Sequence, residues 1–230
     1  MRAADWPARW VRERLGYEPR DVTLFRSALT HRSAAPANNE RLEFLGDAVV
    51  NLAVARALYV AFPKASEGDL SRLRARLVSA QPLAEIAGEL NLGEELQLGS
   101  GELKSGGFRR QSILADAFEA LCGAMFLDGG LEGVEPVLAR LFAARIATLP
   151  APEALKDAKT RLQEYLQSRS LELPHYAVAA VEGEDHAQSF TVSCDVPALQ
   201  LKTSGHGSSR RRAEQEAAER MIETLGTRSV

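Results

Sequence analysis

Up to about residue 149, hydrophobic positions recur every three or four residues, which is the spacing of amphipathic helices. Gly and Pro residues interrupt this pattern, and a Gly-rich loop is expected at residues 99–110. The pattern predicts an all-α domain. The expected helices cover residues 6–15, 21–29, 40–62, 70–93 with a break at Pro82, 112–127, and 131–147 after a break at Asp128-Gly129-Gly130.

A different pattern follows residue 156. Segments with helical spacing at both ends enclose three short segments that are rich in β-branched and aromatic residues, as strands are. An α-β-β-β-α order over about 70 residues favours a small α+β domain with both helices on one side of its sheet. The expected elements are residues 159–169, 176–181, 189–196, 199–203 and 209–225.

Two prolines near residue 150 favour a linker between these patterns. The sequence therefore predicts three parts. They are an all-α domain at residues 1–148, a linker at 149–156 and an α+β domain at 157–226.

Composition excludes few classes of protein. With 45% hydrophobic and 26% charged residues the chain resembles ordinary globular proteins, and its net charge of −3 requires any nucleic-acid-binding surface to be local. Cys122 and Cys194 lie in apolar stretches without a ligand pattern, so we expect both to be buried. The N-terminal segment lacks the apolar core of a leader, and by this reading no run approaches the roughly 18 apolar residues of a membrane span. We expect a cytoplasmic protein with no membrane partner.

Carboxylates interrupt two of the apolar helical segments. Glu40, Glu43 and Asp47 are spaced i, i+3, i+7, and Asp116 and Glu119 are spaced i, i+3, so each set shares a helix face. Clustering like charges is costly unless a cation lies between them, and oxygen ligands without cysteine or clustered histidine favour Mg²⁺ or Mn²⁺. Such ions can assist phosphodiester hydrolysis. The alternative is that the acids are only solvated or pair with nearby arginines.

Three polar patches mark the second domain. A stripe with i, i+3, i+4, i+7 spacing lies on its first helix, a histidine lies between the first two strands, and an arginine triplet opens the last helix. A basic triplet at a helix N-terminus suits phosphate, although a plain solvated surface is the alternative for the stripe and the histidine. The patches consist of Thr160, Gln163, Glu164 and Gln167, then His186, then Arg210, Arg211 and Arg212.

The segment NERLEFLGD, at residues 39–47, closely resembles the nine-residue signature of the ribonuclease III family. The likeness continues in LTHRS at 29–33, EGDLSRLRA at 67–75 and the long block from 98 to 128. The second domain resembles a double-stranded-RNA-binding domain. The segments that carry this likeness are KTRLQEYLQ, GEDHAQSF and GHGSSRRRAEQEAAE.

The resemblance implies a magnesium site, with Mn²⁺ able to substitute. By position, its ligands would be Glu43, Asp116 and Glu119. Asp47 would complete the site and help to orient the attacking water, so that Asp47 and Glu119 are the implied catalytic residues. The three polar patches would contact two minor grooves of an A-form duplex and the phosphates between them.

Five further residues have supporting roles or roles that the sequence leaves open. The resemblance implies that Glu40 and Glu67 are acids that support the site or the RNA. Glu102 and Lys104 match positions near the cleavage valley but could form an ordinary polar turn. His31 could serve as a general base or have a structural role, and the roles of these last three residues are left open.

The resemblance implies a Mg²⁺-dependent endoribonuclease that cuts double-stranded RNA, including structured rRNA and mRNA precursors. It implies 5′-phosphate and 3′-hydroxyl ends with short 3′ overhangs, water as the nucleophile, a homodimer and no nucleotide cofactor. Phe44 is a candidate dimer-interface residue, or else an ordinary core phenylalanine. One alternative is a catalytically silent RNA-binding protein, which the presence of all the acids disfavours. Another is a nucleotide phosphohydrolase, which would need a His-Asp pair that these four histidines do not supply.

Overall fold

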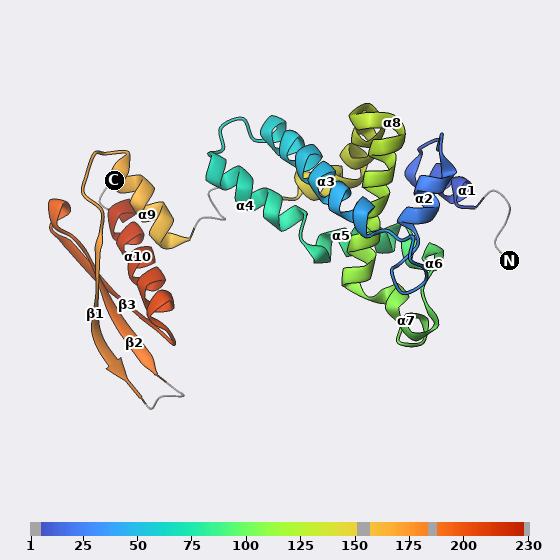
Figure 1. Ribbon diagram of the computed structural model, residues 1–230. Coiled ribbons are helices and arrows are strands. Elements are labelled where there is room, and N and C mark those ends of the chain that lie inside the picture. The colour runs from blue at the N-terminus through green and yellow to red at the C-terminus, as the bar shows by residue number, and fades with distance from the viewer. Residues whose placement is uncertain (1–5, 151–156, 184–187, 228–230) are drawn as a thin grey trace. The chain divides into compact units, whose positions relative to one another are not determined.

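The chain forms two compact units, Met1–Leu149 and Pro150–Val230, in the computed structural model (Figure 1). The structure describes residues 6–150, 157–183 and 188–227. Most of the predicted linker, residues 149–156, therefore lies outside the described residues.

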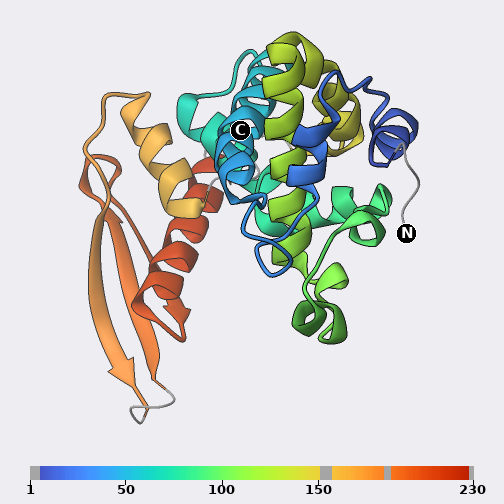
Figure 2. The same cartoon turned by 45° about the vertical axis from the view of Figure 1, so that its right-hand side comes forward.

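The N-terminal unit is built from helices, as the hydrophobic pattern predicts. Helices α3 and α8 lie side by side at its centre in both views (Figures 1 and 2). The helices are α1 (Ala8–Trp10), η1 (Val11–Leu15), α2 (Val22–Ala28), α3 (Glu40–Ala61), α4 (Glu67–Leu77), α5 (Ala80–Glu89), α6 (Leu92–Glu95), α7 (Ser100–Lys104), η2 (Gly107–Arg109) and α8 (Gln111–Ala147).

Two glycines let the backbones of α3 and α8 touch. A Cβ atom added at Gly46 would lie 1.7 Å from the carbonyl oxygen of Glu119, and one added at Gly123 would lie 2.3 Å from the carbonyl oxygen of Leu42. Only a residue without a side chain fits at either position. Buried side chains of both helices, including Val50 and Phe118, extend the contact into the core.

Two boundaries in this unit differ from the sequence-based expectation. Pro82 does not divide two helices, because α4 ends at Leu77 and Ser79 already caps α5. Pro82 lies in the first turn of α5, where its missing N–H would have no partner within the helix anyway. The predicted Gly-rich loop contains the short helices α7 and η2. The break predicted near residue 130 is confirmed, since Gly130 leaves helical geometry with φ 67° inside α8.

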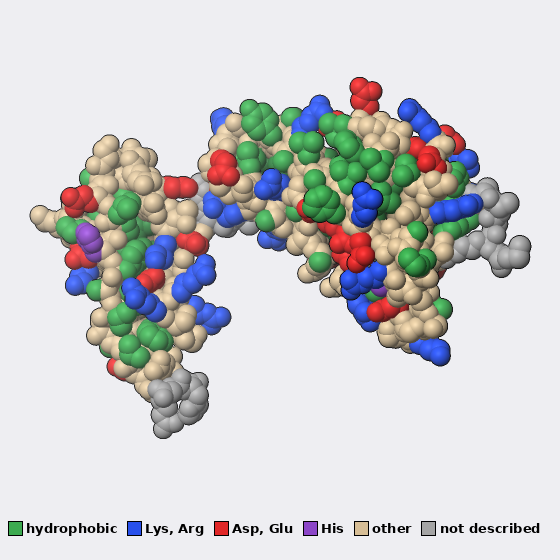
Figure 3. Space-filling view, in the orientation of Figure 1, with side chains coloured by type: hydrophobic (Ala, Val, Ile, Leu, Met, Phe, Trp, Pro, Cys, Tyr) green, Lys and Arg blue, Asp and Glu red, His purple; other side chains and the backbone are tan. Residues whose placement is uncertain are grey.

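Helix α3 exposes an unusually apolar surface. Phe44 is 82% exposed, and Leu52, Tyr59 and Val60 are also exposed. Hydrophobic side chains gather over α3 and α8 in the space-filling view (Figure 3). Because Phe44 is exposed, the alternative that it is a core residue is wrong for this unit.

The same helix is long and apolar enough to cross a membrane by length and composition, with a hydropathy of 1.5 over its most apolar window. The expectation that no run reaches that length is therefore wrong by this measure. Core helices of soluble proteins pass the same test, and 33% of the window is buried within the structure.

The C-terminal unit has the predicted α-β-β-β-α order, and the predicted fold class is confirmed. Helices α9 (Ala158–Gln167) and α10 (Arg210–Thr227) lie on the same side of the sheet (Figure 2). The antiparallel sheet has the order β1-β2-β3. Its strands are β1 (His175–Glu182), β2 (Ser189–Val196) and β3 (Leu201–Gly207), and η4 (Pro197–Leu199) precedes β3.

The third strand begins later and runs further than the pattern predicts. The short helix η4 occupies Pro197–Leu199, and Gln200 has a φ of 53°, so pairing starts only at Leu201, opposite Val196. The core between sheet and helices includes Leu162, Cys194 and Met221. Both cysteines are buried, as predicted, and neither forms a disulfide.

Candidate active site and nucleic-acid interface

The glycine contact between α3 and α8 brings three carboxylates together. Glu43 lies in the first turn of α3, three residues before Gly46, and Asp116 and Glu119 lie one turn apart on α8. One carboxylate oxygen of each lies within 4.8 Å of the others. All three side chains are half-buried, so the cluster is open to solvent on one side. Three oxygen ligands at this separation suit a hard divalent cation.

Mutual repulsion and burial make these acids hard to ionise together. Burial, followed by the charges of Asp47, Asp116 and Glu43, raises the pKa of Glu119 to about 8. Burial also raises the pKa of Glu43 and of Asp116, and for Glu43 the nearby Asp116 charge adds to the effect. At neutral pH the cluster by itself therefore keeps a proton on Glu119, which a cation would displace on binding.

His31 and Arg32 lie beside the cluster. The charges of His31 and Arg32 oppose the rise in the pKa of Asp116. Arg32 also lies 3.3 Å from Glu40, from Nη1 to Oε1, so Glu40 forms an ion pair as one alternative anticipated. Nδ1 of His31 is hydrogen-bonded to the hydroxyl of Ser33 at 2.8 Å, an arrangement that fits a structural role.

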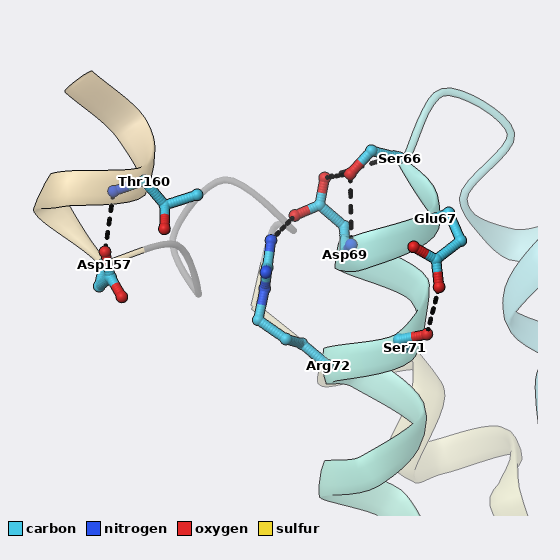
Figure 4. A network of polar contacts seen from close by, with 7 residues as sticks. All are labelled: Ser66, Glu67, Asp69, Ser71, Arg72, Asp157 and Thr160. Atoms are coloured by element: carbon cyan, nitrogen blue, oxygen red, sulfur yellow. Dashed lines mark hydrogen bonds and ion pairs between the residues drawn. The ribbon is translucent and has the colours of Figure 1, made fainter. Parts of the chain in front are cut away.

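The structure brings Asp47 to the edge of the cluster but not Glu67. Asp47 is exposed, and its Oδ1 accepts a hydrogen bond from Nδ2 of Asn51 at 2.9 Å. It lies outside the three-acid group, yet close enough that its charge raises the pKa of Glu119. Glu67 is the first residue of α4, and its carboxylate accepts a hydrogen bond from Ser71 (Figure 4). The three-acid group includes neither Glu67 nor Glu40.

The Gly-rich segment is organised by an ion pair. Oε2 of Glu102 lies 2.9 Å from Nη1 of Arg110, which caps the N-terminus of α8. Lys104 ends α7, six residues before that cap. The segment is therefore an ordered structure rather than the plain polar turn that the sequence left open.

The C-terminal unit gathers part of its polar patches around one hollow. Asp157 caps α9 by accepting a hydrogen bond from the backbone N–H of Thr160 at 2.8 Å (Figure 4). Thr160 and Gln163 on α9 line the hollow together with Arg210 and Arg211 at the start of α10. The remaining lining residues are Asp157, Lys159, Glu214 and Gln215.

The other predicted contacts are not all part of this hollow. Glu164 and Gln167 lie on α9 without lining it, and Nη1 of Arg212 donates a hydrogen bond to the hydroxyl of Ser208 at 3.1 Å. His186 lies outside the described residues. Sequence reasoning missed Lys159, because the residue that organises it, Glu214, is 55 positions away.

Family models cover most of the chain. Residues 21–146 match a model described as ribonuclease-III-like, and residues 158–225 match a model described as a double-stranded RNA binding motif. These two matches correspond to the two compact units. The three clustered acids lie inside the first match, and the residues lining the hollow lie inside the second, except for Asp157.

Relatives match over nearly their whole length. A Ribonuclease 3 from Thiobacillus denitrificans is 58% identical over 208 residues, which is 90% of this chain and 92% of the relative. A Ribonuclease 3 from Hahella chejuensis is 55% identical over 212 residues, covering 92% and 94% of the two chains.

Solved structures of a ribonuclease III nuclease domain from Campylobacter jejuni are similar to the N-terminal unit. One is 42% identical with a TM-score of 0.59, covering 63% of this chain and 99% of that domain. Another is 45% identical with a TM-score of 0.57, covering 59% and 95%, and is described as flexible in a region involved in dimer formation. With both family models matched in order and relatives of this identity, the chain belongs to the ribonuclease III family of endoribonucleases.

Proposed function

We propose that this chain hydrolyses double-stranded RNA with Mg²⁺ and leaves 5′-phosphate and 3′-hydroxyl ends with short 3′ overhangs. Structured precursors of rRNA and mRNA are the proposed substrates. The observation that carries the proposal is the convergence of Glu43, Asp116 and Glu119 within 4.8 Å. The double-stranded RNA binding motif of the second unit accounts for the choice of duplex RNA.

The donor set fits Mg²⁺, because it consists only of carboxylate oxygens. Glu43, Asp116 and Glu119 would hold the ion, and Mn²⁺ would be accepted by the same oxygens. When bound, the ion supplies positive charge that stabilises the negative charge developing on the phosphate oxygens. The exposed Asp47 carboxylate would orient the attacking water by accepting its hydrogen bond.

Duplex RNA would lie against α9 and the start of α10. The polar side chains of α9 would contact 2′-hydroxyl groups in one minor groove, and the arginines would contact phosphates. The hollow that joins both helices supports this arrangement. The proposed contact residues are Thr160, Gln163, Glu164, Gln167, Arg210, Arg211 and Arg212, with His186 of the undescribed loop.

The proposal predicts that the protein cuts long duplex RNA in Mg²⁺ and leaves it intact in EDTA. Single-stranded RNA and duplex DNA of the same sequence should resist cleavage under both conditions. Products would be separated on denaturing gels, and their ends would be tested by labelling before and after phosphatase treatment. Equal cutting of single strands, or undiminished cutting in EDTA, would contradict the mechanism. Duplex binding without any cleavage would favour the silent RNA-binding alternative.

We also propose that the protein is a homodimer whose interface includes the apolar surface of α3. Four large apolar side chains of this helix are exposed, and such a surface is commonly covered by a partner. The exposed Phe44 lies next to the metal-ligand candidate Glu43, so the interface would adjoin the active site. The dimer-forming region of the Campylobacter jejuni domain supports this choice of partner.

Phe44→Arg is expected to convert the dimer into a monomer. A buried guanidinium without a partner would destabilise the dimer by about 3–5 kcal/mol. Sedimentation velocity at micromolar concentration would report the mass. Leu173→Arg, which changes an exposed leucine of the other unit, should leave the dimer intact. If the Phe44→Arg variant remained a dimer, Phe44 would not be an interface residue. If the wild type were a monomer, the proposed homodimer would be wrong.

A further inference from the structure

Helix α10 carries a buried carboxylate beneath the surface that we assign to RNA. Glu214 is a buried residue, although Lys and Arg side chains gather over α10 (Figure 3). Nζ of Lys159 lies 2.6 Å from its Oε2, and Nε of Arg210 lies 2.9 Å from its Oε1. Each oxygen thus has its own cation, one from α9 and one from α10. A single carboxylate joins the two helices at their N-terminal ends.

Lys159 is fixed from other directions as well. Its ammonium group lies 4.5 Å from the ring centroid of Tyr176 on β1, at a distance suited to a cation–π interaction. Its backbone N–H donates a hydrogen bond to Oε1 of Gln215, 3.2 Å away. The ion pair and the cation–π contact restrict the side chain, and the hydrogen bond of its N–H fixes the backbone.

Both cations nevertheless reach solvent at the hollow. The side chain of Lys159 is 34% exposed and that of Arg210 is 63% exposed, whereas that of Glu214 is 11% exposed. All three residues line the hollow. An approaching phosphate would therefore meet the two cations before it met the carboxylate.

The carboxylate is ionised at neutral pH. Burial raises the pKa of Glu214, but hydrogen bonds from Lys159 and Arg210 outweigh this effect and hold the pKa below its usual value. A negative charge under a phosphate-binding surface weakens RNA binding by Coulomb repulsion. Any favourable contribution of Glu214 to RNA binding must then come from the way it positions Lys159 and Arg210.

We propose that Glu214 is a positioning residue that holds Lys159 and Arg210 side by side, so that both face the same stretch of phosphate backbone. The inference rests on the proposed binding of duplex RNA and adds Lys159 to the contact set. Cations that are already held in place lose less side-chain entropy when phosphate binds. The two cations together outweigh the single carboxylate, which leaves the surface net positive.

Glu214→Gln tests the inference because charge and geometry predict opposite results. The full chain would be titrated with a short RNA duplex in EDTA, where fluorescence anisotropy reports binding, over a series of KCl concentrations. The variant should bind about tenfold more weakly. Its plot of log affinity against log salt should be shallower by about 1, since one phosphate contact is lost.

Glu219→Gln is the matched control. Glu219 also lies on α10 and pairs with an α9 residue, Arg161, at 3.2 Å, but both side chains are exposed. This variant removes the same charge and an ion pair between the same two helices, and it should bind as tightly as the wild type or more tightly. If Glu214→Gln bound as tightly as Glu219→Gln, the positioning role would be overturned.

A second comparison guards against misfolding of Glu214→Gln. Replacing both partners of a buried ion pair is better tolerated than removing one, so Lys159→Met/Glu214→Gln should fold. It should bind duplex RNA more weakly than Lys159→Met alone, although it has one negative charge fewer. Tighter binding by the double variant would overturn the inference. A wild type that binds single-stranded and duplex RNA equally would overturn the proposed RNA recognition itself, whatever the order of the variants.

Discussion

Glu119→Ala should reduce the rate of duplex RNA cleavage by about a thousandfold or more, which corresponds to about 4 kcal/mol of transition-state stabilisation. Burial and then the charges of Asp47, Asp116 and Glu43 raise the pKa of Glu119 to about 8, so Glu119 lies amid the negative charge that a bound cation would neutralise. Its removal would leave Glu43 and Asp116 as the remaining ligand candidates. Single-turnover cleavage in saturating Mg²⁺ would measure the loss.

Duplex binding by Glu119→Ala should be unchanged, because the proposed RNA contacts lie in the other unit. Glu132→Ala is the control for cleavage, since Glu132 is an exposed acid on α8 beyond the break at Gly130. It should cut like the wild type. If Glu119→Ala cut RNA at the wild-type rate, Glu119 would not belong to the active site. If binding and cleavage fell by the same factor, the variant would have a folding defect instead.

Gly46→Ala should destabilise the N-terminal unit by about 3 kcal/mol or more, at the upper end of the usual cost of overpacking. The new methyl group would lie 1.7 Å from the carbonyl oxygen of Glu119. This oxygen belongs to the backbone of α8, so it cannot move aside by a change of rotamer as a side chain could. The helices would have to separate, which would draw Glu43 away from Asp116. Cleavage should therefore fall in the fraction of protein that remains folded.

Urea unfolding followed by tryptophan fluorescence would measure this loss, because both tryptophans, Trp6 and Trp10, belong to the N-terminal unit. Gly88→Ala is the matched control. Gly88 lies within helix α5, and among the described residues no atom would come within 4 Å of its added Cβ. That change should stabilise the unit by about 0.5–1 kcal/mol. Unaltered stability of Gly46→Ala would contradict the close backbone contact.

The sequence predicts the elements well where the determinant is local. Helical periodicity locates α3 and α8, and the i, i+3 spacing of Asp116 and Glu119 correctly puts both on one face. The break at Gly130 is also confirmed, because the glycines that cause it are visible in the local sequence. Pro82 was misjudged because a proline in the first turn of a helix resembles, in sequence, a proline that separates two helices.

Long-range contacts lie beyond the reach of such patterns. The spacing of acids on one helix does not reveal that Glu43 meets Asp116, because a glycine contact between distant segments creates that neighbourhood. The family resemblance supplied this pairing, and the local pattern did not. Likewise, the bond between Lys159 and Glu214 joins residues that no periodicity relates.

The contact between the backbones of α3 and α8 also bears on how this enzyme could be redesigned. Side-chain packing distances change whenever core residues are exchanged, but the separation of these helices at Gly46 and Gly123 is set by main-chain atoms. The remaining hydrophobic core could therefore be rebuilt for thermal stability with little displacement of the carboxylates. In a library of core variants, the two glycines are the positions to hold constant, and activity should then be largely independent of melting temperature.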